Sequence, residues 1–200
     1  MLKAAVLVSG GGTNLQAILD AKAAGKIPHA EIALVVASNP NAYALERARL
    51  AGVPTAVCGR GRDSDEAFSE RLLGILREAG IEIVVLAGYL TILPPQVITA
   101  YDHRILNIHP SLIPAFCGKG YYGLRVHEEA LRRGVKLTGA TVHFVNEIPD
   151  GGDILFQKAV EVLPDDTPEK LQRRVMEQAE WILLPRALEE VARRLTEEEA

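Results

Sequence analysis

Short strand-length runs alternate with amphipathic helical patterns along most of this chain, and this alternation limits its fold more than any other feature. The strand-length runs occupy residues 4–8, 32–37, 55–58, 83–87 and 104–108. The run at 83–87 has no polar side chain on either face, which is typical of a central strand in a parallel sheet. Strands that alternate with helices predict an α/β fold with a mostly parallel sheet.

Helical patterns fill the intervals between these runs. Helical periodicity covers residues 13–25, 43–51, 63–80 and 126–133. Thr13 with Gln16, and Asp63 with Glu66, predict capping boxes at two of the helix starts. In the strongest pattern, spacings of three and four residues predict one buried face, formed by Phe68, Leu72, Ile75, Leu76 and Ala79.

The last third of the chain predicts two more strands, at 139–145 and 154–162, joined by a polar turn at 146–152. Thr167 and Pro168 are typical of a helix start, and Pro185 predicts a kink in the long helix that follows. Its buried side is expected to comprise Leu171, Val175, Ala179, Ile182, Leu188 and Val191. Together the patterns predict a single α/β domain over residues 1–200, with about seven strands in an open twisted sheet and helices on both faces.

Composition narrows the function classes. Hydrophobic residues make up 48% of the chain and charged residues 24%, values typical of a globular protein. The net charge of −4 and the aromatic content of 5% indicate neither a basic surface nor stacking platforms for nucleic acid. The apolar runs are too short to cross a bilayer, and the two cysteines are expected to be reduced thiols in a cytoplasmic protein. No spacing of His, Cys and carboxylates predicts a metal site.

A glycine-rich segment, SGGG at residues 9–12, joins the first strand to the first helix, which opens with Thr13 and Asn14. Consecutive glycines let the backbone approach an anion, and a helix N-terminus offers free N–H groups. The segment matches neither the dinucleotide fingerprint nor the P-loop. It predicts a site for one terminal phosphate, although a tight turn without a ligand would carry the same glycines.

Asn107 and His109 are two residues apart at the end of a predicted strand, so their side chains project from one face. A histidine that moves a proton and an amide that stabilises an oxyanion suit acyl-group transfer. Asp150 opens the Asp-Gly-Gly turn, and its carboxylate beside His109 would raise the pKa of the histidine. A hydrogen-bonded structural pair and an ordinary turn are the alternative interpretations.

The other histidines and Cys117 are weaker candidates. His29, His103 and His127 lie at loop or helix edges and are expected at the surface. His143 is either a neighbour of the site or a core histidine with a satisfied hydrogen bond. No base lies near Cys117 in its loop, so we do not expect it to act as a nucleophile.

Five segments in this order resemble the formyltransferase family that uses 10-formyltetrahydrofolate: SGGGTNLQAI, LAGYLTIL, NIHPSLIP, GATVHFV and the later DGG. The similarity extends from residue 4 to about residue 185. It implies a Rossmann-like formyltransferase fold and formyl transfer to the amine of glycinamide ribonucleotide in purine biosynthesis, with no metal. The N-terminal half would bind the nucleotide phosphate and the C-terminal half the folate.

The resemblance also implies roles for single residues. By similarity, the catalytic residues are Asn107, His109 and Asp150. The ribonucleotide would be held by Gly12, Thr13, Asn14 and Glu180, the last through the ribose hydroxyls. The folate would be held by Leu90, Thr91, Ile92, Leu93, Asn107, Asn146, Glu147, Ile148 and Pro149. Asp65 departs from relatives that carry an arginine there, Thr91 replaces a basic residue, and the loop at 116–122 belongs to a variant subgroup.

Other functions share these motifs. Formyltetrahydrofolate hydrolase resembles this chain but has an added N-terminal regulatory domain, whereas the first strand here begins within a few residues of Met1. Methionyl-tRNA formyltransferase has a further C-terminal domain and binds a polyanion, whereas this chain is acidic. An inert nucleotide- or folate-binding module would lack the Asn–His–Asp set. The expected partners are therefore two small molecules, with neither nucleic acid nor membrane, in a monomer or a homodimer.

Overall fold

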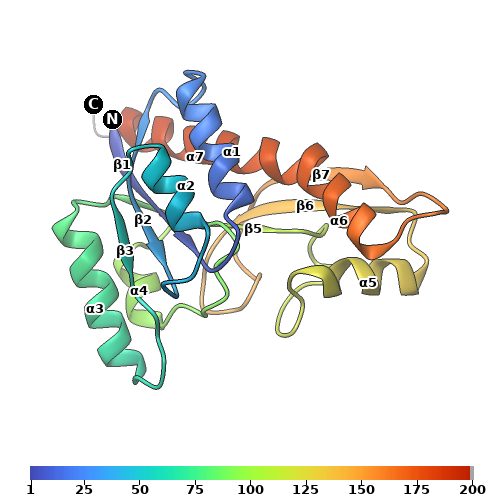
Figure 1. Cartoon of the computed structure of the whole chain (residues 1–200), viewed down its shortest axis with the longest axis horizontal. Coiled ribbons are helices and arrows are strands. Elements are labelled where there is room, and N and C mark those ends of the chain that lie inside the picture. The colour runs from blue at the N-terminus through green and yellow to red at the C-terminus, as the bar shows by residue number, and fades with distance from the viewer. Residues whose placement is uncertain (199–200) are drawn as a thin grey trace.

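Seven strands form one sheet in the computed structural model, which describes residues 1–198 (Figure 1). The order across the sheet is β3-β2-β1-β4-β5-β6-β7. The strands are β1 (Leu2–Val8), β2 (Ala30–Ala37), β3 (Thr55–Val57), β4 (Ile83–Leu86), β5 (Ile105–His109), β6 (Leu137–Phe144) and β7 (Ile154–Glu161). All pairings from β3 to β5 are parallel, and β6 and β7 add antiparallel to that edge. The predicted mostly parallel α/β sheet is therefore confirmed.

Helices cover both faces of the sheet, as predicted (Figure 1). They are α1 (Thr13–Ala23), α2 (Ala44–Leu50), α3 (Asp65–Glu78), α4 (Pro95–Ala100), α5 (Leu124–Arg133), α6 (Pro168–Val175) and α7 (Trp181–Glu198). On one face, Ile18 of α1 and Leu188 of α7 join the apolar cluster that includes Val6 of β1. On the other face, Phe68 of α3 joins the cluster that includes Leu7 of β1. Because alternate residues of β1 face opposite layers, the whole strand must be apolar.

Both predicted capping boxes are wrong. The residue before α1 is Gly12, whose φ of 73° lies in the left-handed region, and no side chain caps this helix. Thr13 is already inside the helix and cannot cap it. The cap of α3 is Ser64 rather than Asp63, and its hydroxyl accepts a hydrogen bond from the N–H three residues ahead.

A π-helical turn, η1 (Met176–Glu180), separates α6 from α7. Such a turn adds one residue to a helix and shifts the face that points at the core. Ala179 and Glu180 are consequently both buried, and Ile182 is 47% exposed rather than buried as predicted. The α-helical hydrogen bonding is interrupted in η1, whereas α7 continues through Pro185. The other residues predicted to be buried in this segment are indeed buried: Leu171, Val175, Leu188 and Val191.

Candidate active site

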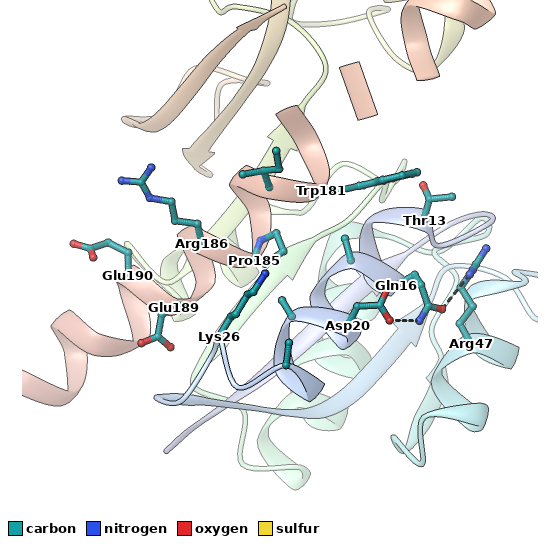
Figure 2. Close-up of a pocket in the computed structure, with 14 residues that line it drawn as sticks. Thr13, Gln16, Asp20, Lys26, Arg47, Trp181, Pro185, Arg186, Glu189 and Glu190 are labelled. Atoms are coloured by element: carbon teal, nitrogen blue, oxygen red, sulfur yellow. Dashed lines mark hydrogen bonds between the residues drawn. The ribbon is translucent and has the colours of Figure 1, made fainter. Parts of the chain in front are cut away.

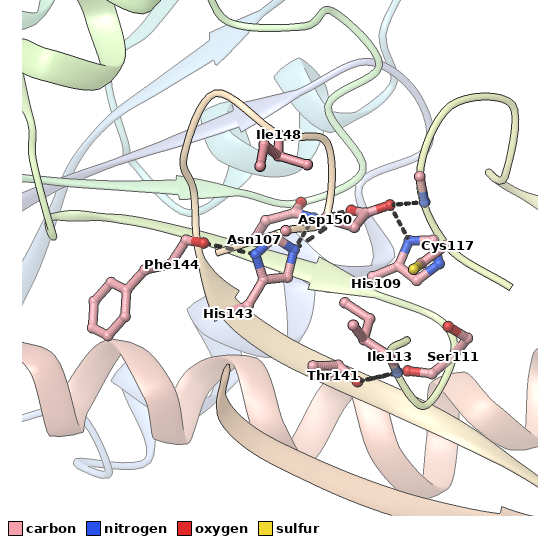
Figure 3. A network of polar contacts seen from close by, with 12 residues as sticks. Asn107, His109, Ser111, Ile113, Cys117, Thr141, His143, Phe144, Ile148 and Asp150 are labelled. Atoms are coloured by element: carbon pink, nitrogen blue, oxygen red, sulfur yellow. Dashed lines mark hydrogen bonds and ion pairs between the residues drawn. The ribbon is translucent and has the colours of Figure 1, made fainter. Parts of the chain in front are cut away.

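The carboxyl end of β5 carries Asn107 and His109, and the turn after β6 brings Asp150 to them (Figure 3). One oxygen of Asp150, Oδ2, lies 3.5 Å from His109 Nδ1, and the other, Oδ1, lies 3.4 Å from Asn107 Nδ2. The antiparallel pairing leads β6 back along β5 until Phe144 lies opposite Leu106, and the turn that follows β6 folds back so that Asp150 contacts Asn107 and His109. The structure thus brings together the three residues that the resemblance marks as catalytic.

Contact with a loop carbonyl sets the tautomer of His109. Its Nε2 lies 2.8 Å from the carbonyl oxygen of Phe116, which can only accept, so Nε2 carries the proton and Nδ1 faces Asp150. Burial lowers the pKa of His109 below its usual value, and the charge of Asp150 offsets this only in part. The prediction that Asp150 raises this pKa is confirmed for the contribution of that carboxylate, which the effect of burial outweighs. The net effect favours the neutral form of His109 over the charged form.

Asp150 occupies the left-handed region at a φ of 56°, which aspartate tolerates better than most residues. The N–H of Gly118 donates to its Oδ2 at 2.8 Å. Burial pushes the pKa of Asp150 upward, but the neighbouring imidazoles of His143 and His109 and the hydrogen bond from the Gly118 N–H outweigh it. The net pKa is below the usual value, so the carboxylate is ionised at neutral pH.

Glycines explain how Asp150 is aimed into the site. A Cβ at Gly152 would overlap the backbone carbonyl oxygen of Phe144, and a Cβ at Gly151 would lie 2.6 Å from Ile148 Cγ2. The Asp-Gly-Gly turn is therefore packed against its own loop and against the end of β6. Larger residues would displace the carboxylate.

His143 is a further member of the network, and the sequence left its role open. Its Nδ1 donates to the Phe144 carbonyl at 2.7 Å, so its Nε2 accepts a hydrogen bond from Asn107 Nδ2 at 3.1 Å. This contact turns the NH₂ group of Asn107 toward His143 and Asp150. One N–H donates to His143, and the other donates to Asp150 Oδ1 at 3.4 Å, a long contact that a substrate oxygen could replace.

The predictions for the remaining histidines and for Cys117 have different outcomes. His127 is fully buried on the inner face of α5 rather than exposed, and burial lowers its pKa to about 4. His29 and His103 are on the surface, as predicted. Burial and the nearby charge of Asp150 raise the pKa of the Cys117 thiol, which agrees with the absence of a nucleophilic role.

A cavity of about 130 Å³ opens beside Asn107 and Asp150. Every residue that the resemblance assigns to the folate lines it: Leu90, Thr91, Ile92, Leu93, Asn107, Asn146, Glu147, Ile148 and Pro149. Leu86, Ile98 and Val145 add an apolar wall. Apolar sides with a polar end suit a flat heterocycle whose reactive edge meets the network.

The glycine loop precedes α1. Its Gly12 packs against α2, because a Cβ there would lie 2.6 Å from Ala44 Cβ, whereas Gly10 and Gly11 have open space at that position. The next residues begin the helix, and the buried Asn14 donates from Nδ2 to Glu180 Oε2 at 2.7 Å. The segment predicted to bind the phosphate and the carboxylate predicted to bind the ribose are therefore neighbours, although 166 positions separate Asn14 from Glu180.

Glu180 is only 6% exposed and lies on η1. Burial raises its pKa to about 7, and the hydrogen bond from Asn14 opposes this only in part. A buried carboxyl with a single donor has remaining capacity for hydroxyl groups of a ligand. Each candidate ligand site contains residues from both halves of the chain. Segments 90–93 and 146–149 line the cavity predicted for the folate, and Asn14 contacts Glu180 in the site predicted for the ribonucleotide.

A larger cavity, of about 830 Å³, lies between α1 and α7 (Figure 2). Thr13 and Gln16 lie on one wall, and Trp181 and Pro185 on the other. It borders the glycine loop through Thr13 and Arg47 but does not include the Asn–His–Asp network.

Neither a metal centre nor a membrane span is found in the part of the chain that the structure describes. No group of three or more His, Cys, Asp or Glu residues within 1–198 is placed to hold a metal ion. Over the same residues, no helix is long and apolar enough to cross a membrane.

Comparison with known proteins connects this geometry to a family. A model of the formyl transferase family matches residues 2–188. A chloroplastic phosphoribosylglycinamide formyltransferase from Arabidopsis thaliana is 43% identical over 176 residues, which are 87% of this chain and 60% of that protein. Phosphoribosylglycinamide formyltransferase from Haemophilus influenzae is 43% identical over 179 residues, 89% of this chain and 82% of that one. The crystal structure of glycinamide ribonucleotide transformylase 1 from Symbiobacterium toebii has a TM-score of 0.89 at 44% identity and covers 96% of this chain and 88% of that one.

Proposed function

This chain belongs to the formyl transferase family, and on that premise we propose that it transfers a formyl group from 10-formyltetrahydrofolate to the amine of glycinamide ribonucleotide, a step of purine biosynthesis. The observation that carries the proposal is the network of Asn107, His109 and Asp150 at the end of β5. Its position beside a cavity suited to a flat heterocycle supports two substrates meeting there. The chain spans about 60% of the plant relative's length, and the proposal concerns the part described here.

The two ligands would occupy adjoining sites. The phosphate would lie on backbone N–H groups at Gly12, Thr13 and Asn14, with the ribose hydroxyls on Glu180. The pterin would lie between segments 90–93 and 146–149. The N–H of Leu90 donates to Ser9 Oγ at 2.9 Å, so the two sites share a boundary.

The chemistry follows from the protonation states. The amine nitrogen forms a bond to the formyl carbon, the bond from that carbon to N10 of the folate breaks, and the proton lost by the amine ends on N10. The N–H of Asn107 that lies 3.4 Å from Asp150 would turn to the oxygen that becomes negative and stabilise it. His109 is neutral with a bare Nδ1, so it accepts the amine proton, and the ionised Asp150 stabilises the resulting imidazolium.

A turnover assay on the whole chain tests the proposal. We expect rapid loss of 10-formyltetrahydrofolate only when glycinamide ribonucleotide is present, with formylated ribonucleotide as the product. Folate loss at an equal rate without the ribonucleotide would instead indicate the hydrolase alternative. Binding of both ligands without turnover would indicate an inert module.

We expect the partners to be these small molecules, in the cytoplasm, where the two thiols stay reduced. A net charge of −4 gives no general attraction for a polyanion. A salt-dependent gel shift with initiator tRNA would contradict this and favour the methionyl-tRNA reaction.

A further inference from the structure

Three carbonyl groups of the glycine loop are all held from the side of α2. Asn39 Nδ2 donates to the Ser9 carbonyl at 2.9 Å, and Arg47 Nε donates to the Gly11 carbonyl at 2.7 Å. Between them, the N–H of Ala44 donates to the carbonyl of residue 10 at 3.1 Å. The loop is therefore oriented by one neighbouring segment, residues 39–47.

This orientation decides where the N–H groups of the loop point. In a planar trans peptide, each carbonyl points opposite to the N–H of the next residue. With the carbonyls of residues 9–11 turned toward α2, the N–H groups of residues 10–12 are turned away from it. Gly10 and Gly11 are exposed, and nothing lies within 4 Å of a Cβ built on either residue, so the loop has room for a ligand. Consecutive N–H groups on an open surface form a cradle for an anion.

Of the three groups that donate hydrogen bonds to the loop carbonyls, only the Arg47 side chain is charged. Its Nη1 donates to Gln16 Oε1 at 3.0 Å, and its guanidinium lies 5.2 Å from the centre of the Tyr43 ring (Figure 2). These two partners and the Gly11 carbonyl are all neutral, so the positive charge is not cancelled by a carboxylate. The side chain is thus fixed in place and still able to attract a phosphate dianion.

We propose that Arg47 is a positioning residue for phosphate recognition: its Nε keeps the loop carbonyls turned back so that the N–H groups face the ligand, and its charge adds to the attraction. The ligand class that this geometry recognises is a phosphate monoester. The identity of that monoester as glycinamide ribonucleotide rests on the proposed function.

The test uses the whole chain with Arg47→Ala and Arg47→Lys, and Arg49→Ala as the matched control. Arg49 is on the same helix but pairs with Glu46 at the surface. Calorimetry measures the Kd of glycinamide ribonucleotide, of the riboside that lacks the phosphate, and of the folate. Arg47→Ala should weaken ribonucleotide binding by about 10–100-fold, the usual range for a charged hydrogen bond. The riboside and the folate should bind to it as they bind to the unchanged protein, and Arg49→Ala should match the unchanged protein throughout.

Arg47→Lys separates geometry from charge. Lysine keeps the charge but cannot reproduce the Nε and Nη1 contacts together, so it should restore only part of the affinity. Turnover at saturating ribonucleotide should stay near that of the unchanged protein in both variants, because KM changes rather than kcat. If Arg47→Lys binds the ribonucleotide as tightly as the unchanged protein does, the charge alone would account for the affinity, and the positioning role would be overturned.

A second measurement keeps this inference separate from the proposed function. Inorganic phosphate should shift the backbone amide NMR signals of residues 10–12, and Arg47→Ala should abolish those shifts. If the protein shows the shifts but no formyl transfer, the proposed function fails and the cradle stands. Equal weakening of ribonucleotide and riboside binding, or unchanged phosphate shifts in Arg47→Ala, would overturn the inference. If Arg47→Ala does not fold, the same comparisons on Arg47→Lys decide.

Discussion

The two candidate ligand regions are built from opposite parts of the polypeptide. At residues 9–12 the backbone would face the proposed ligand, and side chains such as Arg47 and Asn39 hold it from the other side. At the end of β5 the side chains of Asn107 and His109 would face the proposed ligand, and backbone groups such as the Phe116 carbonyl hold them in place. In a site made of side chains, a substitution can remove a functional group and leave the backbone in place. In a site made of backbone N–H groups, a substitution acts only by filling the ligand space or by disturbing the residues that pack against the loop.

The largest effect should follow removal of a side chain from the β5 site. His109→Ala should lower kcat by about 10²–10⁴, the usual value of general acid–base catalysis. The fold should persist, because the side chain makes polar contacts with Phe116 and Asp150 and is not part of either apolar cluster. Rates, both substrate affinities and a thermal melt should be measured together. His103→Ala, a change at an exposed histidine, is the control.

A variant that keeps its kcat would show that His109 does not move the proton. Loss of kcat that tracks loss of the folded fraction would assign His109 a purely structural role.

The next effect should separate two neighbouring glycines. Gly11→Val places its side chain in open space, so it should spare stability and weaken ribonucleotide binding by about 10–100-fold through lost charged hydrogen bonds. Gly12→Ala should instead lower stability, since its Cβ would lie 2.6 Å from Ala44 Cβ and its φ is 73°. Melting curves and calorimetry distinguish the two. Equal binding loss for the folate in Gly11→Val would contradict a local phosphate site.

A smaller effect concerns Glu180, whose pKa is raised from 4.5 to about 7. Between these pH values the folded protein holds a proton that the unfolded chain has lost, so the stability from this group falls as pH rises. Glu180→Gln cannot ionise, so its free energy of unfolding should exceed that of the unchanged protein by about 1–3 kcal/mol at pH 8 and should show no such gain below pH 4.5. Urea unfolding at the two pH values measures this. A pH-independent difference would mean that Glu180 does not titrate in this range.

The smallest effect should be a shift in a pH profile. The charge of Asp150 opposes the lowering of the His109 pKa by burial. In Asp150→Asn that support is lost, so the pKa of His109 should fall further and the acid limb of kcat/KM should move to lower pH. A limb that stays in place while the rate is unchanged would reduce Asp150 to a turn residue.

Sequence patterns predicted the features that depend on neighbouring residues in the chain, such as the strands and the face from which a side chain projects. The apolar run in β4 and the two-residue spacing of Asn107 and His109 report strand geometry directly. The cap of α1 depends on a distant contact instead, because Gly12 takes its left-handed conformation where it packs against Ala44. The sequence pattern at Thr13 and Gln16 is typical of a capping box, but packing against a distant residue determines how α1 begins.

The net pKa and the tautomer of His109 could not be predicted from the sequence, because both depend on tertiary contacts. The net pKa of His109 depends on how deeply a loop from 110–120 buries it, and its tautomer depends on one carbonyl in that loop, from Phe116. His127 was assigned to the surface because its place near a helix start says nothing of which face α5 turns inward. Neither property has a signature in residue spacing.

The π-helical turn at residues 176–180 has a consequence for engineering this chain. Deleting one residue there would join α6 and α7 into an unbroken α-helix, a change that looks like an improvement on grounds of regularity. The deletion would leave α6 and α7 in nearly their present orientation, because one α-helical residue fewer turns the chain about as far as the wider π-turn does, so Leu171 and Leu188 would still face the sheet. With the extra residue gone, Ala179 and Glu180 could no longer both point inward. Straightening this helix could therefore keep the apolar core and still separate the Glu180 carboxyl group from Asn14.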